Sequence, residues 1–257
     1  MASRLLPGVL HYVRALAGAA RGGERRDAEL LDQFLTRRDE AAFAGLLERH
    51  GPLVFGVCRQ ILGDCHDAED AFQATFLVLA RKAAYVRRHQ SVAAWLHRVA
   101  VNISRTARRS SARRRAHEKE AVLMAPTTPA ADEAVRDWQP ILHEEVDLLP
   151  ENYRVALVLC YFQGRSHDQA ARELGWPLGT VKGRLARARD LLRTRLARRG
   201  VAPTVAGLAA ALAESATAAV PPALLGVTLR AAVTFAAGGA GAGSAASAVA
   251  VTLARGA

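Results

Sequence analysis

The 257-residue sequence has few of the residues from which catalytic, metal or disulfide sites are built. It contains three cysteines and no CxxC pair, so it indicates neither a disulfide framework nor a zinc site, and it fits a reducing compartment. We also find no glycine-rich phosphate loop, no metal-ligand spacing and no nucleophile–base set that helical periodicity does not already explain. We therefore expect no metal, no cofactor and no enzymatic activity.

Aromatic residues are also scarce, at 5%, although hydrophobic residues make up 51% of the chain. Alanine, leucine, valine and arginine dominate instead, and these are mostly good helix formers with few strand formers among them. The composition predicts an all-α protein.

Long runs of strongly apolar residues are scarce. The start, Met1 to Ala20, is interrupted by Pro7, His11 and Arg14 and does not resemble a signal peptide. Ala231 to Leu253 is uncharged and long enough to span a bilayer, but alanine and glycine leave it with few strongly apolar side chains. We expect a cytoplasmic protein, with membrane tethering through this segment as the less favoured alternative.

Acids are outnumbered, and the formal charge of +11 indicates a polyanionic partner, either nucleic acid or an anionic membrane surface. Arg81 to Arg115 has eleven basic residues and no acid, and Leu178 to Gly200 has eight against one. Between them, Asp132 to Glu151 carries seven acids. Two basic blocks separated by an acidic one suggest two contacts with a polyanion; the alternative is that the arginines only solvate helices.

Helical periodicity and its interruptions divide the chain into five segments. These are a lead-in (1–27), a first helical domain (28–115), a linker (116–136), a second helical domain (137–200) and an Ala/Gly-rich extension (201–257). Within the first domain, breaks are expected at Gly51-Pro52, at Gly63-Asp64 and around His89 to Ser91. The prediction is two small helical domains joined by a flexible linker.

A helix-turn-helix is predicted between Ser166 and Leu192. Ser166 and Gln169 form a capping box, and Gly175 supplies a left-handed stop. The next helix has a core-facing stripe of Val181, Leu185, Ala188 and Leu192. Candidate DNA-contacting residues on its other faces are Thr180, Lys182, Arg184 and Arg187. An ordinary helical hairpin fits the same pattern, and Trp176 is interpreted as a packing residue of the turn.

Two sets of motifs resemble extracytoplasmic-function sigma factors. Leu148 to Arg154, Ala170 to Gly175 and Gly179 to Arg189 are similar to the fourth region of that family, and DAEDAFQATFL at Asp67 to Leu77 is similar to the second. The resemblance covers about two thirds of the chain. One departure is Gly183, where the family usually has serine, which puts the −35 sequence preference in doubt. The extension resembles the Ala-rich tails of sigma factors from planctomycete-like bacteria.

The resemblance implies that the first domain binds the RNA polymerase core and opens the −10 element, while the second reads the −35 element. The residues implied for base capture and phosphate contact at the −10 element are Arg88, His89, Gln90, Ser91, Arg98, Arg105, Arg108 and Arg109. Promoter DNA and core polymerase are then the partners, and an anti-sigma factor is a further candidate.

The polymerase-binding face is expected on a helix from Ala68 to Ala80, capped by Asp67 and buried through Phe72 and Phe76. The residues expected to project outward from it or to bind polymerase are Asp67, Glu69, Asp70, Gln73 and Leu77. An acidic face beside an exposed leucine suits a protein partner, although a solvated acidic helix start would look the same. The rival function is a stand-alone helix-turn-helix regulator that binds duplex DNA without polymerase.

Overall fold

The computed structural model describes residues 25–121, 138–214, 218–237 and 247–256. Every regular element in these ranges is helical, which confirms the all-α class. The first domain contains α2 (Asp27–Arg37), α3 (Glu40–Leu62), α4 (Cys65–Val86) and α5 (Val92–Ala121). Because α5 continues to Ala121, residues 116–121 of the predicted linker are helical, and the rest of that linker lies outside the described residues.

Short acidic side chains set the starts of α3 and α4. Asp39 accepts a hydrogen bond from the backbone N–H of Ala41, and Asp64 accepts one from the N–H of Asp67, both at 2.9 Å. The expectation that Asp67 caps this helix is therefore wrong: α4 begins at Cys65, and Asp67 lies in its first turn. An aspartate one turn earlier takes the capping position because Gly63, with φ of 74°, ends the preceding helix there.

The predicted break at Gly51-Pro52 is absent, and α3 runs through it without interruption. Proline removes one helical hydrogen bond, but Leu47 and Leu53, on either side, are buried completely or almost so, and their burial outweighs that loss. The glycine has a packing role. An ideal Cβ at Gly51 would lie 3.4 Å from Val220 Cγ2 in the C-terminal extension, so the chain approaches closely here.

Phenylalanines form the centre of the first domain. Phe72 of α4 lies edge-on to Phe55 of α3, with ring centroids 5.8 Å apart, and 5.0 Å from Phe76. Phe43 joins the same cluster at 6.4 Å from Phe76. All four rings are buried, so four of the seven phenylalanines of the sequence pack together where α3 and α4 meet.

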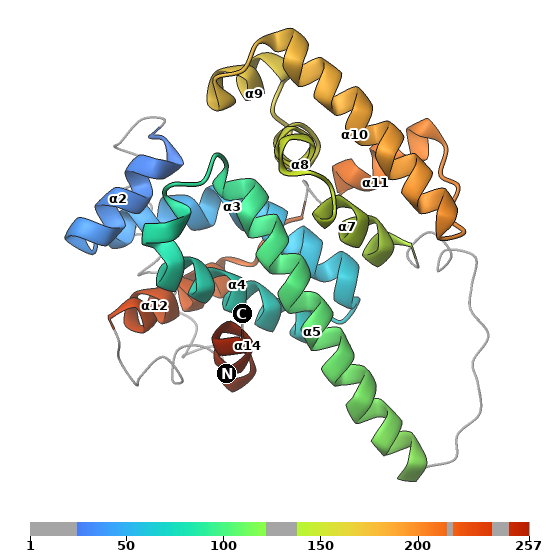
Figure 1. Ribbon diagram of the computed structural model, residues 1–257. Helices are drawn as coiled ribbons and strands as arrows, with labels where there is room; N and C mark the ends of the chain where they lie inside the picture. The colour runs from blue at the N-terminus through green and yellow to red at the C-terminus, as the bar shows by residue number, and fades with distance from the viewer. Residues whose placement is uncertain (1–24, 122–137, 215–217, 238–246, 257) are drawn as a thin grey trace.

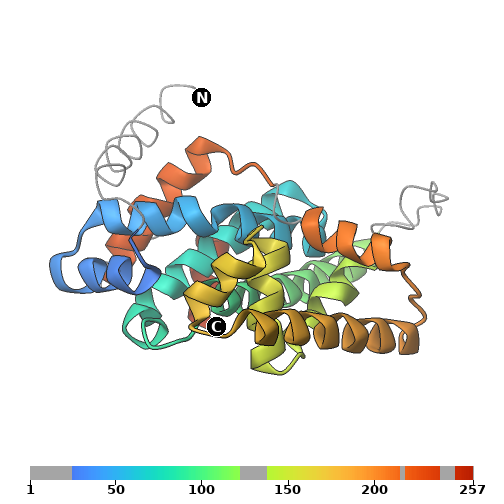
Figure 2. The same ribbon diagram turned by 90° about the horizontal axis from the view of Figure 1, so that it is seen from above.

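The second domain is built from four short helical segments followed by one long helix. They are α7 (Gln139–Asp147), α8 (Glu151–Leu157), the π-helical turn η3 (Val158–Phe162), α9 (His167–Leu174) and α10 (Leu178–Arg198). Helix α7 contacts α3 and α5 of the first domain as well as α10 of its own (Figure 1). It therefore lies at the junction of the two domains, which Figure 2 shows from above.

The C-terminal extension is also helical and packs on both domains. It contains α11 (Val205–Glu214), which contacts η3, then α12 (Pro222–Ala236) and α14 (Ala248–Gly256), which both contact α4 (Figure 1). Leu224, Leu225 and Leu229 of α12 are buried.

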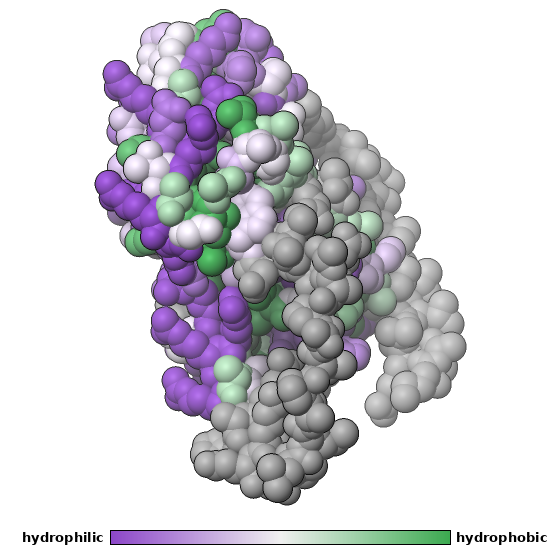
Figure 3. Space-filling model, turned by 90° about the vertical axis from the view of Figure 1, so that its right-hand side faces the viewer, coloured by the Kyte–Doolittle hydropathy of each residue, from purple (hydrophilic) through white to green (hydrophobic). Residues whose placement is uncertain are grey.

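None of the helices within the described ranges has the length and hydropathy needed to cross a membrane. Hydrophilic side chains gather along one edge of the face seen in Figure 3.

Candidate nucleic-acid interface

The helix-turn-helix has the predicted local structure. Ser166 Oγ accepts from the N–H of Gln169 at 3.2 Å, and Gln169 Oε1 accepts from the N–H of Ser166 at 2.9 Å. Gly175 adopts φ of 65° and ends α9. The core-facing stripe of α10 is buried as expected: Val181, Leu185, Ala188 and Leu192. This confirms the capping box, the stop and the buried stripe, which together orient α10.

The opposite side of α10 carries free cationic groups. Lys182 and Arg187 are exposed, whereas Thr180 is half-buried. Gly183 is exposed between them, and a Cβ built there would meet no atom within 4 Å. Packing therefore does not require glycine at this position, and its small size leaves the backbone open to close approach by a groove of DNA.

Arg184 differs from its neighbours because it stacks on Trp176. Its guanidinium carbon lies 3.8 Å from the centroid of the indole ring, a cation–π contact that joins α10 to the turn before it. Trp176 is itself partly buried against the core, in agreement with its interpretation as a packing residue. Arg184 is thus held against the turn, whereas Lys182 and Arg187 extend into solvent.

The loop between α4 and α5 carries the residues implied for base capture. Arg88 and Gln90 are exposed, and His89 is half-buried with its ring 4.6 Å from that of Tyr85. Ser91 is buried, and its Oγ accepts from the N–H of Ala94 at 3.3 Å. Ser91 therefore acts as the N-terminal cap of α5, a structural role that the sequence-based interpretation missed.

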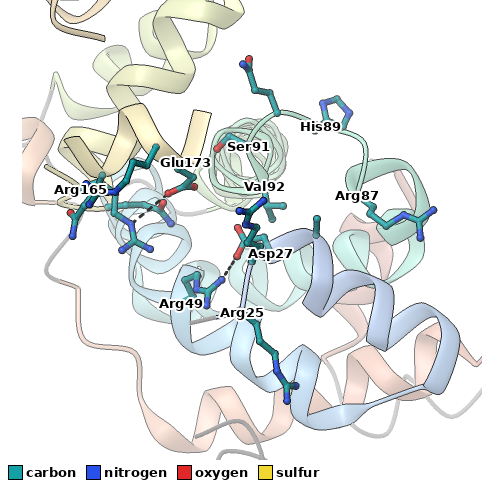
Figure 4. A pocket seen from close by; sticks show the side chains of 15 residues that line it. Arg25, Asp27, Arg49, Arg87, His89, Ser91, Val92, Arg165 and Glu173 are labelled. Atoms are coloured by element: carbon teal, nitrogen blue, oxygen red, sulfur yellow. Dashed lines mark hydrogen bonds and ion pairs between the residues drawn. The ribbon is translucent and has the colours of Figure 1, made fainter. Parts of the chain in front are cut away.

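This loop faces α9 across a cavity of about 520 Å³ (Figure 4). The cavity is strongly basic: its arginines are Arg25, Arg26, Arg49, Arg87, Arg165 and Arg172, and its carboxylates are those of Asp27 and Glu173. Arg49 pairs with Asp27 at 2.5 Å, and Arg165 lies 3.8 Å from Glu173. Burial and the nearby Asp27 raise the pKa of Glu173. Because guanidinium groups outnumber carboxylates, the cavity should attract phosphate groups.

Two arginines implied for phosphate contact are already paired with carboxylates. Arg98 Nε lies 3.4 Å from Asp147 Oδ1, and Arg105 Nε lies 3.4 Å from Glu144 Oε1. Both carboxylates belong to the end of α7, in the acidic block between the two basic ones. Arg108 and Arg109 are exposed. The structure therefore divides this predicted set into arginines directed at α7 and arginines directed at solvent.

The same end of α7 also binds the second basic block. Arg199 donates to Glu144 Oε2 at 2.8 Å and to Glu145 Oε1 at 3.3 Å, and Arg195 lies 3.9 Å from Glu145. Sequence reasoning treated the acidic block only as a spacer between two cationic contacts. Its position between two basic blocks was nevertheless a signal that it could pair with both.

A buried histidine pair fixes α7 against the first domain. His143 Nε2 lies 2.6 Å from Gln60 Oε1, an oxygen that can only accept, so His143 donates there and its Nδ1 accepts from His97 Nε2 at 3.2 Å. Both rings are fully buried. Burial lowers the pKa of His143 from 6.5 to about 3; burial, and then His143, also lower the pKa of His97. Both imidazoles are therefore neutral at pH 7.

We expect acid to weaken this junction. Because the folded-state pKa of His143 is below that of the unfolded chain, the stabilisation is complete above pH 6.5 and is lost as the pH falls toward 3. At pH 5 the loss is about 2 kcal/mol for this residue. The free energy of unfolding, measured by urea denaturation at pH 7.5 and at pH 5, gives this loss. His143→Gln should remove the share of the pH-dependent difference that comes from His143 and leave the share of His97, whose pKa is also lowered. The exposed His66→Gln should keep the whole difference; an unchanged pH dependence in His143→Gln would rule out this origin.

The acidic face of α4 is not the open surface that was expected. Gln73 is only 8% exposed and Leu77 is fully buried, so the expectation that both project outward is wrong. Asp67 Oδ2 accepts from Ser111 Oγ at 3.1 Å, and Asp70 Oδ1 accepts from Ser247 Oγ at 2.6 Å. The physical reason is packing from two sides: α5 supplies Ser111, and α12 and α14 of the C-terminal extension both contact α4.

Comparisons with known proteins match both helical domains. The family model described as "Sigma-70 region 2" matches residues 46–114, and "Sigma-70, region 4" matches residues 140–192. "ECF RNA polymerase sigma factor SigM" of Mycobacterium tuberculosis is 34% identical over 195 residues, which are 75% of this chain and 93% of that protein. "ECF RNA polymerase sigma factor SigE" of Mycolicibacterium smegmatis is 31% identical over 169 residues, 62% of this chain and 65% of that relative.

Among solved structures, CnrH in complex with the cytosolic domain of CnrY is 24% identical to this chain, with a TM-score of 0.35. The match covers 67% of this chain and 97% of that one. Residues 201–257 lie beyond both matched family regions.

Proposed function

The chain belongs to the extracytoplasmic-function RNA polymerase sigma factors, and on this premise we propose that it binds core polymerase through α4 and recognises promoter DNA through α10 and the α4–α5 loop. Such factors are initiation factors: they bring polymerase to a promoter and open its strands. The observation that carries the assignment of roles is the order of the two matched regions, each with its own cationic surface.

For the −35 element, the proposed contacts are those of Lys182 and Arg187, with Thr180 beside them. These side chains lie on the face of α10 opposite its buried stripe, which is the geometry of a recognition helix in a major groove. Arg184 is proposed to act together with Trp176, because stacking fixes the direction of its guanidinium.

For the −10 element, the proposed contacts are Arg88, His89 and Gln90 of the loop, followed by Arg108 and Arg109 on α5. His89 and Gln90 line the basic cavity (Figure 4), whereas Arg88 and the two α5 arginines are exposed to solvent. Arg98 and Arg105 join this set only when α7 moves away, because their present partners are Asp147 and Glu144. Promoter opening on this proposal requires the two domains to separate.

For the polymerase, the proposed face comprises Asp67, Glu69, Asp70 and Gln73, with Leu77 supporting it from the core. We further infer that residues 201–257 are an Ala-rich extension of the planctomycete-like kind, supported by their composition and by their position outside the matched regions. The protein is proposed to act in the cytoplasm, where polymerase is, and an anti-sigma factor is proposed as a further partner.

The test of this function is binding to core polymerase followed by transcription. Purified protein is expected to co-elute with core polymerase and to start transcription in vitro from a cognate promoter. Glu69→Lys reverses a half-buried charge on the proposed polymerase-binding face of α4 and should weaken core binding roughly tenfold, as expected for one interfacial charge contact. Glu48→Lys makes the same charge change at an exposed position on α3 and should bind as the wild type does.

Circular dichroism separates a lost contact from a lost fold. If Glu69→Lys unfolds the chain, the residue is structural and the assignment of this face fails. If the wild-type protein binds duplex DNA tightly and never associates with core polymerase, the proposed function is wrong and a stand-alone helix-turn-helix regulator takes its place.

A further inference from the structure

The proposed polymerase-binding face of α4 is covered by the chain's own last helix. Helices α14 and α12 both lie against α4 (Figure 1). Ser247, at the start of α14, is 177 residues from Asp70 of α4 in the sequence. A segment so distant reaches this face only through tertiary packing. Two of the residues in contact with this segment, Asp70 and Gln73, belong to the proposed polymerase-binding face.

Ser247, which caps α14, makes the specific contacts with α4. Its Oγ donates to Asp70 Oδ1 at 2.6 Å, and its backbone N–H donates to Gln73 Oε1 at 3.3 Å. The same Oγ accepts from the N–H of Ala250 at 3.0 Å and so caps the helix. One serine therefore starts α14 and binds two residues of the proposed polymerase-binding face.

The two C-terminal helices are held with different strength. Helix α12 buries three leucines and packs near Gly51 of α3 through Leu225, 3.6 Å from an ideal Cβ. In the described part of α14 the fully buried residues are Ala250 and Ala254, while Val251 and Leu253 are partly buried against the core. Two alanines and two partly buried side chains remove less apolar surface from water than the three buried leucines of α12, so α14 is the helix that detaches at the smaller cost.

The connection between α12 and α14 is short, so weak contacts are enough to keep α14 on α4. Residues 238–246 separate the described parts of α12 and α14, and four of these nine residues are glycine. A tether of this length keeps α14 at a high effective concentration next to α4, so it remains bound with few contacts. The one charged side chain among the described residues of α14 is that of Arg255, which is exposed near the end of the helix.

We propose that α14 is a built-in cover of the polymerase-binding face, which core polymerase must displace from Asp70 and Gln73 before it binds. This inference rests on the proposed function, because it assumes that polymerase uses this face. When the cover is closed most of the time, the apparent affinity for core is the intrinsic affinity multiplied by the open fraction, and opening the cover restores the intrinsic value.

Ser247→Asp is the variant that opens the cover with least damage. Aspartate is a good N-cap and still accepts from Ala250, but it has no proton to donate and places a second carboxylate beside Asp70. Thr252→Asp is the matched control, since Thr252 is exposed on the same helix and receives the same charge. A chain ending at Ala246 removes α14 and leaves α12, as a second test that does not depend on one substitution.

The dissociation constant for core polymerase is measured for all four proteins, with circular dichroism as the check on folding. Ser247→Asp and the shortened chain are expected to bind about tenfold more tightly than wild type, which corresponds to loss of one charge-assisted hydrogen bond. Thr252→Asp should match wild type. If Ser247→Asp does not fold, the shortened chain decides.

Three other results have distinct meanings. Equal and tight binding by all four proteins would overturn the cover and leave the proposed function standing. Weaker binding by a folded shortened chain would make α14 part of the binding surface, which also overturns the cover. If no protein, including the shortened chain, binds core polymerase, the proposed function itself fails.

Discussion

Replacing Lys182 and Arg187 together by glutamate is expected to reduce promoter binding by the polymerase complex about 100-fold. Each side chain is exposed on the outer face of α10, and loss of one DNA contact costs about 1–3 kcal/mol, so two reversals multiply. The fold should be unaffected, because the buried stripe of α10 faces the other way. Binding is measured on promoter fragments at fixed salt, and each single variant is expected to show a part of the loss.

Arg37→Glu supplies the control for charge. It is exposed at the end of α2, far along the chain from the recognition helix, and should leave promoter binding near the wild-type value. Core binding should also persist in the double variant. Promoter binding of the double variant at wild-type strength would show that α10 does not read DNA through this face.

Phe72→Ala is expected to lower the free energy of unfolding by about 3–5 kcal/mol, the cost of truncating a fully buried aromatic residue. Its ring contacts those of Phe55 and Phe76 and also lies 3.9 Å from an ideal Cβ at Gly51. The cavity would therefore open where α3, α4 and the extension meet. The loss is a large part of the 5–15 kcal/mol typical of a whole protein.

Urea denaturation followed by circular dichroism measures this effect. Tyr85→Ala, on the same helix but 60% exposed, should change stability by no more than about 0.5 kcal/mol. A change below 1 kcal/mol in Phe72→Ala would mean that the surrounding helices close the cavity, or that the aromatic cluster does not stabilise the fold.

Local features of the sequence were enough to predict the second domain. The capping box at Ser166 and the left-handed Gly175 involve residues within a few positions of one another, and the stripe beginning at Val181 follows from helical geometry alone. Such features depend on short-range hydrogen bonds and periodicity, so they survive in any tertiary setting. Sequence therefore predicted both the helix-turn-helix and the face it presents.

Features that depend on distant packing were not predictable in the same way. Pro52 was expected to end a helix, but burial of neighbouring leucines keeps α3 continuous. Leu77 was expected to be exposed, but periodicity cannot show that a segment beyond residue 217 covers α4. The Ala-rich extension has no motif that names its binding surface, and only the folded chain shows Ser247 beside Asp70.

The carboxylates of α7 also act as internal counterions of two arginines that are proposed to contact DNA. When Arg98 or Arg105 transfers from Asp147 or Glu144 to a phosphate, the DNA releases condensed cations, but the freed carboxylate takes up cations in return. The net release for these two contacts is then smaller than for the unpaired Arg108 and Arg109. Promoter affinity should therefore fall less steeply with salt than a count of arginines would suggest, leaving more of the discrimination to base contacts.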